Sequence, residues 1–407
     1  MENVIFYSLG FLFITPLLPR TIANVVLGLF VLLCVINFIV AVSKSFGTGI
    51  FVISSLLFLV FTVSLTYTDN LDYGIKKVTT ALPLLLLPLS LAMWTPALLA
   101  ALKKHLNKLL YIYVGSIILV SLFTVFEFRE EVLSPGKFHA AVLASGLSIG
   151  MDALYYSFHL AMALISTVYL FWSNRTFYKQ LLLVVAMAGL SILLLMLSFK
   201  STIIAFIIAF GLFALKINHY KVWTLFTSIL ILVIGLVTFS TGFNKQFADL
   251  IFVKNQSDME YAEIKKTIQL CVVELAPEAG LFGFGIGDGK QELIACYNGK
   301  NQALKNSSYN SHNQYLGIYL KVGLVGLLAL AVHLLTLLFL GLNRKNHLGT
   351  SVLILIGIFM LAENILEREQ GVYYFAVFLG VLFLNDFKKS PKNDMVLSHE
   401  KVLDSLN

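Results

Sequence analysis

Apolar runs long enough to cross a membrane recur from one end of this chain to the other. A helix of about 20 apolar residues spans a bilayer, and only helices and closed barrels satisfy every backbone polar group in lipid. Charged residues make up 13% of the 407 residues, which is about half the share in a soluble domain. The runs predict an all-α, polytopic integral membrane protein.

Reading the apolar runs between polar breaks predicts about twelve transmembrane helices. They cover residues 3–18, 21–42, 48–67, 78–94, 108–127, 153–172, 179–197, 201–216, 221–241, 313–341, 349–363 and 371–386. The chain therefore divides into nine spans within 1–241, a loop at 242–312, three spans within 313–386 and a tail at 387–407.

The basic residues give the orientation of these spans. An even number of spans puts both ends on one side, and the short loops on that side hold roughly twice as many Lys and Arg as the opposite loops. The positive-inside rule then predicts cytoplasmic ends, a cytoplasmic tail and one long periplasmic loop. The net charge of +7 is dispersed between spans with no basic stripe, so no nucleic-acid partner is expected.

The long loop contains an amphipathic segment followed by a Gly-rich turn. Residues 260–275 have helical spacing, and Pro277 is expected to end the helix, which would lie on the membrane or on the bundle. No strand precedes the glycines, so a dinucleotide site is rejected. Alternating glycines allow a backbone to approach either a ligand or another helix. The apolar face and the glycines are Ile264, Ile268, Cys271, Val272 and Leu275, then Gly283, Gly285, Gly287 and Gly289.

Three cysteines are present, and two of them flank the Gly-rich turn. In an oxidising periplasm Cys271 and Cys296 could form a disulfide, which would pin the turn to the amphipathic helix. Alternatively, Cys271 is simply buried on the apolar face of that helix. Cys34 stands alone in the second span, as a small packing residue.

The stretch "NSSYNSHNQYLGIYLKVGLVG" places a histidine at the start of the tenth span. Ser311 and Gln314 form a capping-box pattern, which predicts that the helix begins at Ser311 with His312 in its first turn. A neutral imidazole there could accept a proton from a hydroxyl, or it could be an interfacial histidine that is only solvated. One helix face is expected to carry His312, Tyr315, Tyr319, Gly323 and Gly326.

Other charged residues also gather near the outer ends of spans. Lys200 lies between two apolar runs, where a charge is costly and usually functional. In "LAENILEREQG", Glu363 is expected to share a helix face with Glu367, and Asn364 with Arg368. Glu363 and Glu367 could take part in the function of the protein, or they could form salt bridges that only stabilise the fold.

These residues resemble the O-antigen ligase and O-antigen polymerase superfamily of bacterial envelope glycosyltransferases. The segment "HNQYLGIYLKVGLVG" fits its pattern H-[NSQ]-x9-G-x-x-[GTY], with His312, Asn313, Gly323 and Gly326 in the defining places. "GLFGFGIGDGKQEL" is similar to its Gly-rich turn, "FKSTIIAF" to the start of a span that carries an arginine, and "ENILEREQGVYYF" to the tail of ligase-like members. The likeness covers about residues 150–385.

The resemblance implies a donor glycan on undecaprenyl pyrophosphate and direct transfer to a hydroxyl with inversion, without metal or cofactor. His312 would be the base. Lys200 stands where the first pyrophosphate-binding arginine is expected and Lys265 or Lys266 near the second, with Arg368 as a further cation. Lysine keeps the charge but loses the bidentate fork of arginine. Asp152 stands at a position where members of this superfamily often have a histidine.

The resemblance also implies partners and a location. The acceptor would be lipid A–core for a ligase, or a second lipid-linked glycan for a polymerase, and membrane lipids would surround the protein. The protein would lie in the bacterial inner membrane with its site facing the periplasm. Transfer to a protein hydroxyl is a further option. A transporter or flippase would explain the intramembrane charges, but not the long loop with its amphipathic helix.

Overall fold

The computed structural model describes residues 2–388 apart from 42–45, 133–134, 148–149, 218, 226, 229–255, 302–303 and 305–307. Most of the predicted ninth span, at 221–241, and nearly all of the predicted cytoplasmic tail lie outside the described residues. The first part of the predicted long loop, up to residue 255, lies outside them as well.

Helices form almost all of the structure in these ranges, and the one isolated β-bridge joins Leu147 and Met151. The prediction of an all-α polytopic membrane protein is confirmed. In chain order the elements are α1 (Glu2–Ile14), η1 (Thr15–Leu17), α2 (Arg20–Val40), α3 (Thr48–Val63), η2 (Ser64–Thr66), α4 (Leu71–Thr80), α5 (Pro83–Ala92), α6 (Pro96–Glu127), α7 (Pro135–Ser145), α8 (Ala153–Ser173), α9 (Phe177–Leu197), α10 (Lys200–Ile217), α13 (Gln256–Ala279), α14 (Gly289–Lys300), α15 (Gln314–Asn343), α16 (His347–Phe359), η4 (Ile365–Glu367) and α17 (Glu369–Lys388).

Nine helical segments in the described part of the chain are long and apolar enough to cross a membrane. Each overlaps a predicted span. The first and eleventh predicted spans correspond to α1 and α16, which are shorter apolar helices of 13 residues each. The predicted boundary of the fourth span is wrong, because the helical segment begins at Leu71, and the predicted fifth span is part of a 32-residue helix, α6. The count of twelve spans stays a prediction.

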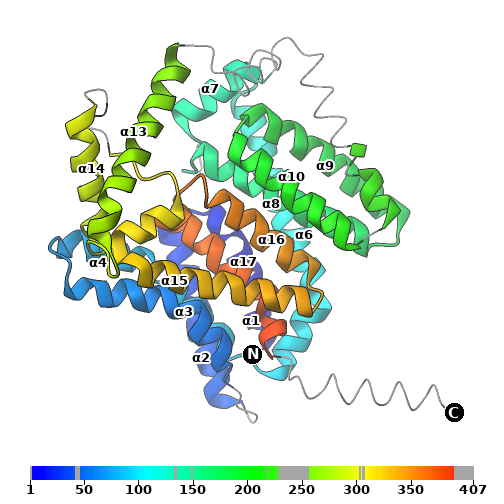
Figure 1. The fold of residues 1–407 in the computed structure, drawn as a ribbon. Helices are drawn as coiled ribbons and strands as arrows, with labels where there is room; N and C mark the ends of the chain where they lie inside the picture. The colour runs from blue at the N-terminus through cyan, green and yellow to red at the C-terminus, as the bar shows by residue number, and fades with distance from the viewer. Residues whose placement is uncertain are drawn as a thin grey trace, which may run out of the picture.

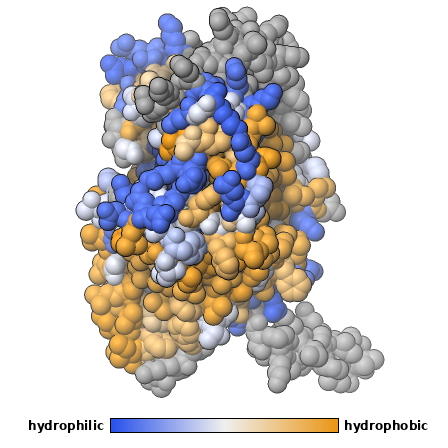
Figure 2. Space-filling view, turned by 60° about the vertical axis from the view of Figure 1, so that its left-hand side comes forward, coloured by the Kyte–Doolittle hydropathy of each residue, from blue (hydrophilic) through white to orange (hydrophobic). Residues whose placement is uncertain are grey.

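Helices α8 and α17 form the centre of the bundle. Each has 83% of its apolar window buried inside the protein, against 28–50% for the other candidate spans. α8 packs against α6, α9, α10 and α16, and α17 packs against α3, α5 and α16 (Figure 1). The surrounding helices expose large apolar side chains on their outer faces, and apolar surface covers the lower part of the view in Figure 2. Such a surface suits contact with lipid.

One end of the bundle, which we call the loop end, carries α13 and α14 (Figure 1). Hydrogen bonds join its segments: Tyr67 donates to the Phe282 carbonyl over 2.6 Å, and the N–H groups of Asp69 and Asn70 donate to Asp288 over 2.8 and 2.9 Å. These contacts fix α14 to the start of α4. Hydrophilic residues gather above the apolar surface in Figure 2.

The predicted amphipathic helix is present as α13, and its apolar face is confirmed. Ile268, Cys271, Val272 and Leu275 are buried in one cluster with residues of α14 and α15. α13 therefore lies on the bundle. The prediction that Pro277 ends it is wrong, because the helix continues to Ala279 and ends before Gly280. Gly280 has a φ of +52°, a conformation that glycine adopts at helix ends without strain.

The Gly-rich turn docks on a kink in α15, where Val322 and Gly323 leave the helical conformation. The N–H groups of Phe284 and Gly285 donate to the carbonyls of Leu320 and Lys321 over 2.9 and 2.8 Å. In return, the N–H groups of Leu324 and Val325 donate to the carbonyls of Gly280 and Leu281. The turn thus satisfies backbone groups that the kink frees.

Glycine is required on both sides of this junction. A Cβ atom on Gly283 would lie 2.4 Å from the Lys321 carbonyl carbon, and one on Gly323 would lie 2.3 Å from the Leu281 carbonyl carbon. Of the two possibilities that the sequence left open, close approach to another helix is the one observed. The kink also means that His312, Tyr315, Tyr319, Gly323 and Gly326 do not share one continuous helix face, so that prediction is wrong.

Candidate functional site

His312 lies just outside the helix that follows it. α15 begins at Gln314, and its N-cap is Asn313, whose side-chain oxygen accepts a hydrogen bond from the Leu316 N–H over 3.1 Å. The predicted helix start at Ser311 is therefore wrong. Asn313 provides a better cap, and it leaves His312 in a turn with a φ of +47°. This left-handed conformation is uncommon for a residue other than glycine, and residues held in it cluster at active sites, ligand clamps and switch regions.

Glu363 lies beside the His312 ring. The Oε1 atom of Glu363 is 3.5 Å from the Nδ1 atom of His312. The Glu363 side chain is 26% exposed and the His312 side chain 23% exposed. A carboxylate on this side favours the tautomer with the proton on Nδ1 and leaves Nε2 as the proton acceptor. It would also stabilise an imidazolium that forms during reaction. The Tyr309 ring, with its centroid 5.9 Å away, lines another side of the imidazole.

Asn364 holds the turn that carries His312. It is 6% exposed, and its side chain forms hydrogen bonds with the backbone N–H and carbonyl of Asn313, at 3.2 and 3.1 Å, and with the Ser311 hydroxyl. Because Asn364 follows Glu363 directly, the backbone that positions the carboxylate also positions the imidazole.

The start of α15 is joined to the connection between α16 and α17 at further points. The Gln314 N–H donates to the Met360 carbonyl over 2.8 Å, and the Gln314 side-chain oxygen accepts from the Leu366 N–H over 2.7 Å. Tyr315 donates to the Gly357 carbonyl and Tyr319 to the Ala276 carbonyl. Both tyrosines therefore join elements together rather than point into a site.

Glu367 lies between two lysines from distant parts of the chain. Its carboxylate pairs with Lys321 of α15 and with Lys77 of α4, the latter at 2.8 Å. The side chains of Glu367 and Lys321 are 7% and 6% exposed. Residues 360–368 form turns and a 3₁₀ helix rather than an α-helix. The predicted shared faces of Glu363 with Glu367 and of Asn364 with Arg368 are therefore wrong.

Arg368, the residue after Glu367, contacts the start of α8. It donates to Asp152 over 2.8 Å and lies over the Tyr155 ring. Burial alone lowers the pKa of the guanidinium, but the carboxylate of Asp152 raises it, so the pKa lies above its ordinary value. Asp152 is also the N-cap of α8, since it accepts a hydrogen bond from the Leu154 N–H over 3.0 Å.

Lys200 stands at the same end of the bundle. It is the exposed first residue of α10, and the Thr202 hydroxyl, two residues on, lies 2.9 Å from the Ser157 hydroxyl of α8. This contact places the start of α10 beside the start of α8, where Asp152 and Arg368 meet.

Lys265 and Lys266 lie in α13, in the segment that was predicted to be the long loop. Both lie in the first half of α13, and Lys265 is about 20 Å along the helix axis from Ala279. Within the described residues, neither forms an ion pair or hydrogen bond with His312. The structure thus brings Glu363 and Asn364 to His312, but it does not bring these two lysines into direct contact with it.

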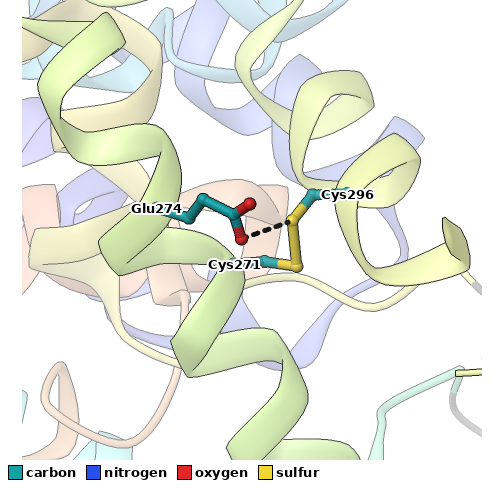
Figure 3. Close-up of side chains that lie close together, drawn as sticks. All are labelled: Cys271, Glu274 and Cys296. Atoms are coloured by element: carbon teal, nitrogen blue, oxygen red, sulfur yellow. Dashed lines mark hydrogen bonds between the residues drawn. A yellow bond between two sulfur atoms is a disulfide. The ribbon is translucent and has the colours of Figure 1, made fainter. Parts of the chain in front are cut away.

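The two loop cysteines form a disulfide, Cys271–Cys296, with a Cα–Cα distance of 5.8 Å. It joins α13 to α14, as Figure 3 shows. Glu274 lies beside it, with a carboxylate oxygen 3.8 Å from Cys296 Sγ, and pairs with Lys300. A sulfur in a disulfide has no proton to donate and no thiolate to offer a metal, so this group is a structural junction. Cys34 is buried and free.

Sequence reasoning missed several members of the charged network. Lys77 and Lys321, the two partners of Glu367, are not among the candidates from sequence, and Asp152 enters only as a departure from the resemblance. Lys321 carried a usable signal, because it is a single charge within the apolar run "IYLKVGLVG". Lys77 lies in a short polar segment with no local signal of its partner, Glu367.

Comparison with known protein families supports the resemblance. A family model described as O-antigen ligase matches residues 182–331. The matched segment includes Lys200, the Gly-rich turn and His312, and it ends before Glu363. The comparison with curated proteins found no match.

Proposed function

We propose that this chain, whose residues 182–331 match a family model described as O-antigen ligase, transfers a glycan from undecaprenyl pyrophosphate to an acceptor hydroxyl. The proposed acceptor is lipid A–core, which makes the chain an O-antigen ligase. A polymerase, which joins two lipid-linked repeat units, is the alternative because the same residues would serve it. The family match supports a glycosyl transferase of this general type over the transporter alternative.

The observation that carries this proposal is the pairing of His312 with Glu363 at 3.5 Å. A base must be accessible to its substrate and must be held in one orientation. His312 is partly exposed, and the turn that carries it is held through Asn364. These features favour the catalytic hypothesis over an interfacial histidine that is only solvated.

In the proposed reaction, the acceptor oxygen forms a bond with the anomeric carbon of the donor glycan. The bond from that carbon to the pyrophosphate oxygen breaks, and undecaprenyl pyrophosphate leaves with the bonding electrons. His312 takes the proton of the acceptor hydroxyl, and Glu363 stabilises the resulting imidazolium. A single displacement inverts the anomeric centre and requires no metal or cofactor.

Cations would stabilise the charge of the leaving pyrophosphate. Lys200 and Arg368 support this part of the proposal because both lie at the loop end, near the start of α8. Lys265 and Lys266 remain candidates from the resemblance. The protein would lie in the bacterial inner membrane, with the loop end facing the periplasm, where lipid-linked glycans are accessible after transport across the membrane.

The lipopolysaccharide of a deletion strain tests the proposed function and its alternative. A ligase predicts loss of O-chains with accumulation of polymer on undecaprenol, and a polymerase predicts caps of a single repeat. If the lipopolysaccharide ladder and the other surface glycans of the deletion strain are all unchanged, both the ligase and the polymerase hypotheses are contradicted. Complementation with the wild-type gene is the control.

Substitution of Lys200 tests its role in binding the donor. We expect Lys200→Arg to retain transfer and Lys200→Glu to remove it, because a phosphate ligand must be cationic. If Lys200→Gln transfers at the wild-type rate, Lys200 is not a donor ligand.

A further inference from the structure

A groove of about 520 Å³ lies between α10, α15 and α16, at the end of the bundle opposite the loop end. α16 lies between α10 and α15 and packs against both (Figure 1). α15 begins beside His312 and runs for 30 residues, so the groove is roughly 40 Å from the proposed reaction site. We call it the Lys216 groove, after a residue of α10 that lines it.

Each of the three helices lines the Lys216 groove with a single face. Residues three and four positions apart lie on the same side of a helix, and the lining residues have this spacing. They are Leu212 and Lys216 of α10, then Leu338, Gly341 and Leu342 of α15 with Lys345 just after it, and His347, Thr350, Ser351 and Ile354 of α16.

The basic side chains of the groove gather at one end, which we call its mouth. Lys216 is in the last turn of α10, Lys345 lies in the turn after α15, and His347 is the first residue of α16. None of the described residues that line the groove is acidic. Asp386 accepts a hydrogen bond from the Asn346 side chain over 2.6 Å, but it does not line the groove. The lining therefore carries two lysine charges with no carboxylate to balance them.

His347 experiences the field of both lysines. Burial lowers the pKa of its imidazole, and the positive charges of Lys216 and Lys345 lower it further. A neutral imidazole can still donate an N–H hydrogen bond to an anion. The start of α16 adds the partial positive charge of a helix N-terminus. An anion at the mouth would thus meet two ammonium groups, an imidazole and a helix start.

The remainder of the groove is apolar and opens onto the surface that suits lipid. Leu212 and Leu342, in its walls, are 37% and 45% exposed. Ile208, one turn before Leu212 on α10, and Leu335, one turn before Leu338 on α15, are exposed as well. An apolar wall that continues from a cationic mouth matches an amphiphile, with its headgroup at the mouth and a chain along the wall. A soluble anion would leave this wall unused.

We propose that the Lys216 groove binds an anionic glycerophospholipid of the membrane. Lys216, Lys345 and His347 would hold its phosphate, because ammonium groups bind phosphate as point charges. One acyl chain would lie along Leu212, Leu338 and Leu342. This lipid would be neither donor nor acceptor in the reaction, and the inference does not rest on the proposed function. Bound between α10 and α15, it would stabilise the packing of both on α16.

Lipid binding to the full-length protein tests the proposal and needs no transfer activity. Native mass spectrometry of the protein in detergent would compare phosphatidylglycerol with phosphatidylethanolamine of the same chains, which has no net charge. The test variant is Lys216→Gln/Lys345→Gln. The matched control is Lys103→Gln/Lys104→Gln, which removes the same charge near the start of α6, outside the groove. All four lysines are exposed, so the variants are expected to fold.

We expect the wild type to prefer phosphatidylglycerol, and the test variant to bind it about tenfold or more weakly. The control variant should bind it as the wild type does. Wild-type affinity in the test variant would overturn the proposal. An equal loss in both variants would also overturn it, because any surface charge would then serve. So would equal binding of the two lipids by the wild type.

A variant of the apolar wall separates a lipid from a soluble anion. Leu212→Trp places a larger side chain in the groove and leaves Lys216, Lys345 and His347 in place. We expect it to weaken phosphatidylglycerol binding, because the acyl chain loses its place. Phosphatidylglycerol bound by Leu212→Trp with wild-type affinity would show that the groove does not hold the chain, and this result would overturn the proposal.

Discussion

The Oδ1 atom of Asn364 accepts a hydrogen bond from the backbone N–H of Asn313 over 3.2 Å. This contact fastens the turn that carries His312 to the connection that carries Glu363. Two segments that are 51 residues apart in sequence thus form one rigid unit, in which an imidazole and a carboxylate keep their relative position.

Asn364→Ala should therefore impair transfer more than it impairs folding. Loss of the side chain frees the His312 turn, and a displacement of about 1 Å at a reacting group can reduce a rate roughly 10²-fold. The control is Asn346→Ala, which removes a cap from α16 at the opposite end of the bundle. Transfer rates and thermal unfolding would be compared for both variants. Equal transfer rates in the two variants would contradict a positioning role for Asn364.

Glu367→Gln should destabilise the protein strongly. Its carboxylate pairs with Lys321 and Lys77, and removal of one partner of a buried ion pair costs about 3–5 kcal/mol because a buried charge is left unpaired. Glu130→Gln, at a pair that is 82% exposed on the acid side, should change the stability by less than about 0.5 kcal/mol. Similar unfolding temperatures for the two variants in the same detergent would show that Glu367 does not stabilise the loop end.

Gly323→Ala should disrupt the junction between α15 and the Gly-rich turn. The added Cβ would meet the Leu281 backbone at 2.3 Å, at a φ of +63°, and a strained conformation alone costs about 1–3 kcal/mol. Gly115→Ala in α6 is the control, since a Cβ there meets nothing within 4 Å. We expect a lower unfolding temperature for Gly323→Ala only. A wild-type value would mean that the turn is not docked on the kink.

The disulfide can be tested by counting thiols in the denatured protein. Without reductant we expect a single free thiol, that of Cys34, and three after reduction. Removal of the bridge by Cys271→Ser should reduce stability by roughly 3 kcal/mol in the chain-entropy model, because the closed loop has 25 residues. Three thiols without reductant would exclude the bridge.

The fold class and much of the site could be predicted from sequence because their signals are local. Spans follow from runs of apolar residues, and the apolar face of α13 follows from helical periodicity. His312 was identified through the motif that contains it. Sequence offered two alternatives for the Gly-rich turn, contact with a ligand or with another helix. It also offered two for Cys271, a disulfide with Cys296 or simple burial. The choice within each pair depends on distances that sequence does not give.

The errors concern residues whose position is set by distant partners. Ser311 resembles a cap in sequence, but its hydroxyl bonds to the Asn313 carbonyl and to Asn364, so the helix begins later. Residues 363–368 have helical spacing in sequence, yet they do not form an α-helix. Glu367 forms an ion pair with Lys321, and Arg368 forms one with Asp152. Pairing between residues so far apart in the chain has no local pattern, which is why sequence does not reveal Lys77 as the partner of Glu367.

The most direct test of the central claim is the rate of glycan transfer by His312→Ala. General-base loss is expected to reduce this rate by about 10²–10⁴-fold, while membrane insertion stays unchanged because the His312 side chain is partly exposed. The control is His105→Ala, in the first third of α6. It should transfer glycan at the wild-type rate. A His312→Ala protein that transfers glycan as fast as the wild type would contradict the catalytic role of His312.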